Sequence, residues 1–305
     1  MARIVVFDEY GDPDVLHVAE VADPAAGPGE VRIRVKAAGV QPFDCLTRRG
    51  DFAAYNPLEF PVHLGNEVAG IIDQVGTGVA GFAAGDEVIA FLSMGGYGDT
   101  VVVPAGQAGR KPAAMPWPEA GVLTASGQTA YTALDELGVK AGDTLLIHAA
   151  AGGVGSYAVQ LARVRGATVI GTASARNHEY LRSLGAIPVS YGPGLIDRVR
   201  AAAPAGVDAV LDAVGGEALD VSVELMGGAT KRVVTIADWA NAARLGVRRI
   251  GTERSVRKLD DLTRLYRDGR LVIEVARAFP LSRAADAHRE VASGHVRGKV
   301  ALVAD

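Results

Sequence analysis

The spacing of apolar residues predicts a change of architecture near residue 117. Over the first hundred residues, short apolar runs alternate with polar positions and are separated by Gly, Pro and Asp, a pattern that predicts β-strands joined by tight turns. Such evenly spaced short strands are typical of a compact antiparallel barrel or sandwich. The predicted strands cover residues 3–7, 31–35, 68–75, 87–91 and 101–103.

From Trp117 onward the spacing becomes helical, with Ala130, Leu134 and Leu137 on one face of a predicted helix. Short apolar strands then alternate with amphipathic helices, which indicates a parallel sheet. Six candidate strands occur in this part, the number found in a doubly wound dinucleotide-binding domain. They cover residues 144–148, 168–172, 187–190, 209–212, 232–236 and 247–250.

The last forty residues or so contain a strand at 271–279, a helix at 282–293 and a strand at 299–303. These elements are too few to form an independent domain. We therefore expect them to pack onto the first domain.

A glycine-rich turn follows the first strand of the parallel region and opens a helix, in the sequence LLIHAAAGGVG at 145–155. Gly152 would let the backbone approach a pyrophosphate, and Gly155 would let the helix pack close to the strand. The amides of the helix start attract phosphate. The first glycine of the usual GxGxxG motif is Ala150 here, and an ordinary tight connection is the alternative interpretation. The six-strand context favours a nucleotide on Ala151, Gly152, Gly153, Val154 and Gly155.

The end of the second strand carries no acidic residue where an NAD enzyme holds its ribose hydroxyls. Ser174 and Arg176 stand there instead. A carboxylate would repel a 2′-phosphate, whereas a hydroxyl and a guanidinium can bind one, so NADPH is favoured over NADH. The alternative for Arg176 is a cap on a solvated helix start. Tyr191 follows the third strand. It is expected either to pack near the adenosine of the cofactor or to pack against the edge of the sheet in the ordinary way.

Composition and charge narrow the class of protein. Of the 305 residues, 49% are hydrophobic and 22% charged, with a formal charge of -4, so neither disorder nor a polyelectrolyte partner is indicated. The single cysteine excludes an internal disulfide and a multi-cysteine zinc lobe. The apolar run at the amino terminus is too short for a secretory signal, and no stretch approaches about 18 apolar residues. We expect a cytoplasmic protein without a membrane partner.

These features and several further motifs resemble the medium-chain dehydrogenase/reductase superfamily, and within it the zinc-free quinone oxidoreductase branch, also called zeta-crystallin-like. The resemblance covers nearly the whole chain. The further motifs are VHLGNEVAG at 62–70, GDEV at 85–88, GYG at 96–98, TAY at 129–131 and GKVALV at 298–303.

The resemblance implies an α/β protein with a GroES-like β-barrel domain and a Rossmann domain, meeting at a cleft. The first would comprise residues 1–124 and 267–305 and bind substrate. The second, a doubly wound parallel sheet over residues 125–266, would bind NADPH. The resemblance also implies a homodimer formed through the Rossmann sheets.

Zinc-using relatives carry a cysteine and a histidine where this chain has Gln41 and Asn66. Neither amide replaces a thiolate or imidazole ligand. Cys45 and His63 are nearby in sequence, but they fit more simply as packing and turn residues than as an improvised site. We predict no metal.

A metal-free site suits reduction of a quinone or enone better than oxidation of an alcohol, because hydrogen-bond donors can stabilise the oxygen that gains charge. Gln41 is the predicted donor, at a position where the branch usually has asparagine. Asp44 is expected to orient Gln41 or the nicotinamide ribose, and a turn cap is its alternative. The predicted proton donor is Tyr55 or water. Tyr55 and Phe91 could supply apolar walls, although ordinary burial is the simpler interpretation for either one.

The remaining cofactor positions come from the resemblance. Thr129 and the turns that hold Val214 and Ile236 match positions that contact the nicotinamide side of the cofactor, and Lys299 is expected to reach the same cleft.

Two other functions stay open. One is an enoyl-thioester or alkenal reductase, for which a basic groove that binds coenzyme A would be evidence. Residues 244–258 carry six basic residues against one acid. Such a cluster is more often a solvated face. The other is a non-enzymatic NADPH-binding sensor, structural or RNA-binding protein. The net negative charge argues against a nucleic-acid partner.

Overall fold

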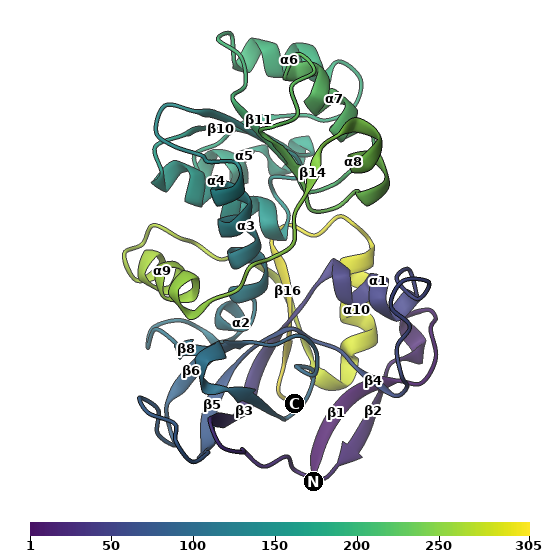
Figure 1. The fold of residues 1–305 in the computed structure, drawn as a ribbon, viewed down its shortest axis with the longest axis vertical. Helices are drawn as coiled ribbons and strands as arrows, with labels where there is room; N and C mark the ends of the chain where they lie inside the picture. The colour runs from purple at the N-terminus through teal and green to yellow at the C-terminus, as the bar shows by residue number, and fades with distance from the viewer. The chain divides into compact units, whose positions relative to one another are not determined.

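The computed structural model describes all residues 1–305. The chain divides into two compact units. The first unit comprises Met1–Ala125, Arg254–Arg267 and Ile273–Asp305, and the second comprises Ser126–Glu253 and Asp268–Val272. Figure 1 shows the two units with the elements labelled.

The first unit is built on β-strands in two sheets. A three-stranded sheet has the order β2-β1-β4, and a larger sheet has the order β15-β16-β3-β5-β6-β8, with β7 also paired to β3. The strands are β1 (Ala2–Phe7), β2 (His17–Val21), β3 (Glu30–Val40), β4 (Val62–His63), β5 (Glu67–Val75), β6 (Glu87–Phe91), β7 (Thr100–Pro104), β8 (Ala108–Arg110), β15 (Val275–Pro280) and β16 (Lys299–Val303).

The carboxyl-terminal strand joins the amino-terminal ones. β16 pairs antiparallel with β3, Val300 lying opposite Val40, so the yellow end of the chain lies beside β3 in Figure 1. Val31, Ile33 and Val68 belong to the apolar core of this unit and are fully buried. The alternation that predicted these strands thus corresponds to one face packed inward.

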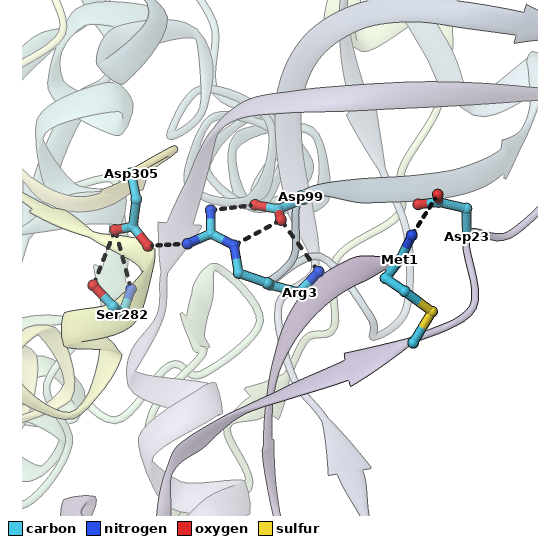
Figure 2. A network of polar contacts seen from close by, with 6 residues as sticks. All are labelled: Met1, Arg3, Asp23, Asp99, Ser282 and Asp305. Carbon is cyan, nitrogen blue, oxygen red and sulfur yellow. Dashed lines mark hydrogen bonds and ion pairs between the residues drawn. The ribbon is translucent and has the colours of Figure 1, made fainter.

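Charged contacts also fasten the two ends of the first unit (Figure 2). Arg3 on β1 donates to the Asp99 carboxylate through Nε at 2.9 Å and to Asp305 through Nη1 at 2.8 Å. The amino group of Met1 pairs with Asp23 at 3.0 Å. These contacts link β1, the segment before β7 and the end of the chain.

The helices of the first unit are α1 (Pro42–Arg49), α2 (Trp117–Ala120), α9 (Val256–Arg267) and α10 (Ala284–Ala292), with 3-10 turns η1 (Pro13–Val15), η2 (Ala105–Gln107) and η4 (Leu281–Arg283). Helix α1 was not predicted from the periodicity. It begins at a proline in its first turn, which needs no amide hydrogen bond there, and ends at Gly50 in the left-handed conformation at φ 91°.

The second unit contains one parallel sheet. Its order is β11-β10-β9-β12-β13-β14, and every neighbouring pair is parallel. Numbered along the chain, this is the doubly wound order 3-2-1-4-5-6. The strands are β9 (Thr144–Ile147), β10 (Thr168–Thr172), β11 (Ile187–Val189), β12 (Ala209–Asp212), β13 (Val233–Thr235) and β14 (Arg248–Arg249).

Helix α3 (Thr124–Glu136) precedes the first of these strands. The strands are connected by α4 (Gly153–Val164), α5 (His178–Ser183), α6 (Leu195–Ala202), α7 (Glu217–Leu225) and α8 (Trp239–Leu245), with the turn η3 (Ala175–Asn177) before α5. Leu146, Ile170, Val210 and Val233 lie side by side on four adjacent strands and form the centre of the core. Each is completely buried. The predicted α/β fold, with a strand-rich domain and a doubly wound parallel sheet, is confirmed.

The structure groups two segments with the other unit than the one predicted for them. Residues 254–266 were assigned to the Rossmann domain, whereas the structure groups them with the first unit, where the Leu259 side chain of α9 packs over Gly109 of β8. Residues 268–272 belong to the second unit. The Gln160 side chain of α4 hydrogen-bonds both the amide and the carbonyl of Val272, at 2.7 and 3.0 Å, so the predicted strand at 271–279 begins only at Val275.

None of the helices combines the length and apolar character required to cross a bilayer.

Candidate active site

The glycine-rich turn of the second unit is held by the end of the neighbouring strand. Thr172, the last residue of β10, accepts hydrogen bonds from the amides of Ala149 and Ala150, at 3.1 Å on its hydroxyl and 3.0 Å on its carbonyl. Ala149 has a φ of 54°, the one positive value at a non-glycine residue. The turn therefore has a fixed conformation that is supported from β10.

Helix α4 begins directly after this turn. Its N-cap is Gly152, and its first internal hydrogen bond runs from the Ser156 amide to the Gly152 carbonyl. The amides of residues 153–155 belong to the first turn, where helix geometry offers no internal acceptor. No acidic side chain lies in that first turn. The helix end therefore presents donors and positive dipole to an anion.

The two key glycines differ in their surroundings. A Cβ at Gly155 would lie 2.4 Å from the Ala149 carbonyl oxygen and 2.6 Å from the Ala150 Cα, so this glycine lets α4 pack against the turn. A Cβ at Gly152 would meet only the Ala149 oxygen, at 3.3 Å. The region around Gly152 is open enough for a diphosphate, and the residues present fit a dinucleotide.

The end of β10 carries the residues predicted to select NADPH. Ser174 is half-buried and occupies the N-cap position of η3 without a side-chain capping hydrogen bond, while Arg176 is exposed. The Ser174 hydroxyl accepts from Asn177 Nδ2 at 3.4 Å, a long contact. None of the residues from Thr172 to Arg176 has a carboxylate side chain. A phosphate at this strand end would meet a hydroxyl and a cation.

The other predicted cofactor residues of the second unit occupy loops at carboxyl ends of strands, except Thr129 on α3. Tyr191 and Val214 are 61% and 57% exposed, and Ile236 is half-buried directly after β13. The Thr129 hydroxyl is hydrogen-bonded to that of Thr252 at 2.5 Å. The exposed apolar surfaces of Tyr191 and Val214 are available to a ligand.

Two buried polar residues that sequence reasoning did not select support these loops. Asp212, at the end of β12, accepts from the Thr235 hydroxyl at 2.6 Å and from the amides of Val214 and Gly215. His148, at the end of β9, is 1% exposed, and burial lowers its pKa well below the usual value. Their positions at ends of parallel strands are the signal that could have identified them.

In the first unit, three buried side chains meet at the start of α1. Gln41 Nε2 donates to Glu67 Oε1, and Lys299 Nζ donates to Gln41 Oε1 at 2.6 Å. Lys299 Nζ also lies 3.4 Å from Glu67 Oε1. Lys299 was predicted to contact the cofactor, and the structure places it against Gln41. Glu67 belongs to the motif VHLGNEVAG at 62–70, but the sequence gave it no role.

Asp44 adjoins this group from the first turn of α1. Its carboxylate accepts from the Gln41 amide at 2.8 Å and from the Tyr97 hydroxyl at 2.7 Å. Burial raises the pKa of Asp44 to about 6, although these two hydrogen bonds and the Lys299 charge favour the ionised form. Asp44 thus fixes the backbone at Gln41. Tyr97 belongs to the GYG motif at 96–98, to which the sequence gave no role in the site.

The predicted aromatic walls differ from the observed ones. Tyr55 is 87% exposed, whereas Phe91 is buried at the end of β6. Instead, Phe52 stacks on Phe43 with ring centroids 5.4 Å apart and an interplanar angle of 25°, and Phe43 remains 47% exposed. Phe43 lies in the first turn of α1, so this helix carries part of an exposed apolar platform.

The positions of the zinc ligands in related enzymes do not suit a divalent cation here. Gln41 is already bonded to an ammonium and a carboxylate, and the ammonium of Lys299 would repel a cation. Cys45 Sγ contacts the His288 carbonyl at 3.6 Å, and His63 Nε2 the Tyr97 carbonyl at 2.9 Å, so each has its own partner. No group of three or more His, Cys, Asp or Glu side chains could hold a metal.

The basic residues of 244–258 do not form one groove. They fall in both units, and several have partners: Arg244 pairs with Asp220, Arg248 with Glu136, and Arg249 stacks on Trp239. In the first unit, Arg254 donates to two backbone carbonyls, those of Asn66 and Leu92, and Lys258 is buried. Four of the six, Arg244, Arg248, Arg249 and Arg257, are exposed, which agrees with the solvated-face interpretation for most of the segment. The ion pairs at Arg244 and Arg248 give no support to a coenzyme A groove.

Comparison with known proteins agrees with this architecture. Residues 27–113 match the alcohol dehydrogenase GroES-like domain, and residues 188–302 match the zinc-binding dehydrogenase domain. A rat synaptic vesicle membrane protein VAT-1 homolog is 31% identical over 99% of this chain and 84% of its own length.

Solved structures cover the whole chain. A quinone oxidoreductase from Coxiella burnetii has a TM-score of 0.87 and 31% identity, covering 100% of this chain and 99% of its own. A quinone oxidoreductase from Escherichia coli complexed with NADPH has a TM-score of 0.85 and 26% identity, covering 99% of this chain and 100% of its own. The chain therefore belongs to the medium-chain dehydrogenase/reductase superfamily, as an NAD(P)-dependent oxidoreductase with quinone oxidoreductases among its structural neighbours.

Proposed function

We propose that this protein is a zinc-independent, NADPH-dependent reductase of conjugated carbonyl compounds, with a quinone as the preferred substrate class. The observation that carries the proposal is the open first turn of α4 after a Thr172-anchored turn, followed by Ser174 and Arg176 where a carboxylate would select NADH. The Escherichia coli neighbour solved with NADPH supports the same cofactor.

The second unit would hold the cofactor. The amides around Gly152 would bind the diphosphate, and Ser174 with Arg176 would bind the 2′-phosphate. Tyr191, Val214, Ile236 and Thr129 are the proposed contacts to the remaining groups. NADPH, when bound, supplies the hydride.

The first unit would hold the substrate carbonyl. The Gln41 amide is the proposed donor to the oxygen that gains negative charge, a role that oxyanion donors fill in other enzymes. Asp44 holds the Gln41 backbone in place. After hydride transfer from NADPH, the one proton that completes the reduction would come from Tyr55, which is 87% exposed, or from water. The Phe43–Phe52 stack would accommodate a flat, apolar ring.

The donor set at the ligand positions supports the proposed zinc independence. Amides stand at 41 and 66, and the Lys299 ammonium lies beside the first of them. The proposal also includes a homodimer, for which light scattering should give twice the monomer mass.

The test is a panel of acceptors assayed for NADPH oxidation: 1,4-benzoquinone, 9,10-phenanthrenequinone, enones, alkenals and enoyl thioesters. We expect the quinones to be reduced fastest. Replacement Gln41→Ala should lower kcat by about 100-fold, as loss of an oxyanion donor does elsewhere. Tight NADPH binding without oxidation of any acceptor would instead indicate a sensor or binding protein, and enoyl thioesters as the fastest acceptors would favour the double-bond reductase.

A further inference from the structure

Gln41, Glu67 and Lys299 come from three separate elements and meet in the interior of the first unit. Gln41 precedes α1, Glu67 begins β5 and Lys299 begins β16. They are 7%, 0% and 4% exposed. Such complete burial of a lysine and a glutamate is costly unless both are paired and hydrogen-bonded.

Strand register brings the three together. β16 pairs with β3 so that Val300 lies opposite Val40, which places Lys299 beside the residue that follows β3. β5 pairs with β3 so that Val68 lies opposite Ala38. A Cβ on Gly39 would lie 2.0 Å from Glu67 Oε1, so only glycine leaves room for this carboxylate. The arrangement is built into the sheet.

The second carboxylate oxygen fixes Glu67 in turn. Glu67 Oε2 accepts from the Ala125 amide at 2.6 Å, while Oε1 faces Gln41 and Lys299. The carboxylate is therefore held at both oxygens. It cannot rotate without losing a backbone hydrogen bond.

The chemistry of the two charged groups determines which way the Gln41 amide faces. An ammonium only donates and an ionised carboxylate only accepts. The observed arrangement directs Gln41 Oε1 to Lys299 and Nε2 to Glu67. In the flipped orientation, the amide nitrogen would face the Lys299 ammonium, donor against donor. The amide oxygen would face the Glu67 carboxylate, acceptor against acceptor.

We propose that Lys299 and Glu67 are positioning residues that hold the Gln41 amide in one orientation, so that a substrate oxygen would meet its nitrogen and not its oxygen. This inference rests on the proposed function in so far as Gln41 acts on a carbonyl. Replacement of a buried ion pair by apolar residues is often neutral for stability, so stability alone gives little reason for its presence.

The kinetic test is a double-mutant cycle with quinone as acceptor. Lys299→Met should lower kcat by about 10- to 100-fold with little change in the KM for NADPH, because a misplaced donor weakens the transition state. Lys299→Arg should recover part of this loss. In a Gln41→Ala background, Lys299→Met should have no further effect on kcat.

Lys111→Met provides the matched control. Lys111 is equally buried and pairs with Glu87 at 2.8 Å in the same unit. This variant should keep the wild-type kcat. If Lys299→Met lowers kcat equally in the wild-type and Gln41→Ala backgrounds, or if Lys111→Met lowers it as much, the pair acts through general stability and the inference is wrong.

A second readout does not depend on turnover. Gln41 is one of five glutamines, so its side-chain amide can be identified by NMR in glutamine-labelled protein through its loss in Gln41→Ala. We expect Lys299→Met and Glu67→Gln each to shift this signal, while Lys111→Met leaves it unchanged. If the wild type reduces no acceptor, the proposed function fails while the amide signal still decides the inference. An unchanged signal in both variants would overturn it.

Discussion

The two glycines of the nucleotide-binding turn allow packing and binding to be separated. At Gly155, an added methyl would collide with backbone atoms of Ala149 and Ala150 at 2.4 to 2.8 Å, and backbone cannot move aside as a side chain can. At Gly152, the nearest atom is 3.3 Å away and φ is -80°, which any residue adopts. We therefore expect Gly155→Ala to lose stability and Gly152→Ala to lose affinity for NADPH.

The magnitudes follow from these contacts. Gly155→Ala forces α4 away from the turn, and overpacking of this kind costs about 1–3 kcal/mol, or a fall in Tm of about 3–10 °C. Gly152→Ala should leave Tm within about 1 °C of wild type, since its one close contact, at 3.3 Å, requires only a small shift of the Ala149 carbonyl. Its methyl would keep the diphosphate from the amides, and loss of one charge-assisted hydrogen bond, worth about 1.5–3 kcal/mol, weakens NADPH binding about 10- to 150-fold.

Thermal unfolding and NADPH titration by fluorescence measure the two effects. Gly251→Ala is the control, because no atom lies within 4 Å of its added Cβ in the same unit. Both its Tm and its Kd should match wild type. Unchanged NADPH affinity in Gly152→Ala would refute the reasoning about the diphosphate, and unchanged Tm in Gly155→Ala would refute the packing argument.

Three further predictions concern selectivity, pH and metal. Arg176→Ala should raise the Kd for NADPH about 10- to 100-fold and leave that for NADH nearly unchanged; equal losses would reject a 2′-phosphate contact at Ser174 and Arg176. Burial lowers the pKa of His288 to about 3, helped by the Arg48 charge, so the stability that His288 contributes is present above pH 6.5 and is lost as the pH falls toward 3. Between pH 7.5 and 5, the unfolding free energy of wild type should therefore fall by about 2 kcal/mol more than that of His288→Gln, and parallel curves in denaturant titrations would contradict this. Prolonged dialysis against a chelator should leave quinone reduction intact, and stoichiometric zinc in elemental analysis would argue against the donor-set reasoning at Gln41.

Much of the fold was predictable because its signals are local. The six parallel strands and the turn at Gly152 appear as apolar runs and glycines in the chain, and each lies within a few residues of its predicted position. Helix α1 was missed because Pro42 and Asp44 at a helix start resemble a turn in sequence. The site in the first unit depends on strand register between β3, β5 and β16, which no local pattern encodes.

The fate of single residues illustrates the same limit. Lys299 stays a predicted cofactor contact, and the strand register that places it beside Gln41 could not be predicted from the sequence. Arg254 belonged to a basic run by sequence, whereas it donates to two backbone carbonyls. Burial and partner choice are set by contacts between residues far apart in the chain, so the charge pattern alone could not predict them.

The central claim is that a pyridine nucleotide lies on the second unit with its diphosphate at the start of α4. The most direct measurement is a crystal structure of the protein grown with NADPH. We predict density for the diphosphate beside Gly152, against the amides of residues 153–155, with the 2′-phosphate beside Ser174 and Arg176. Nucleotide density at any other place on the chain, or an empty turn at saturating NADPH, would contradict the account.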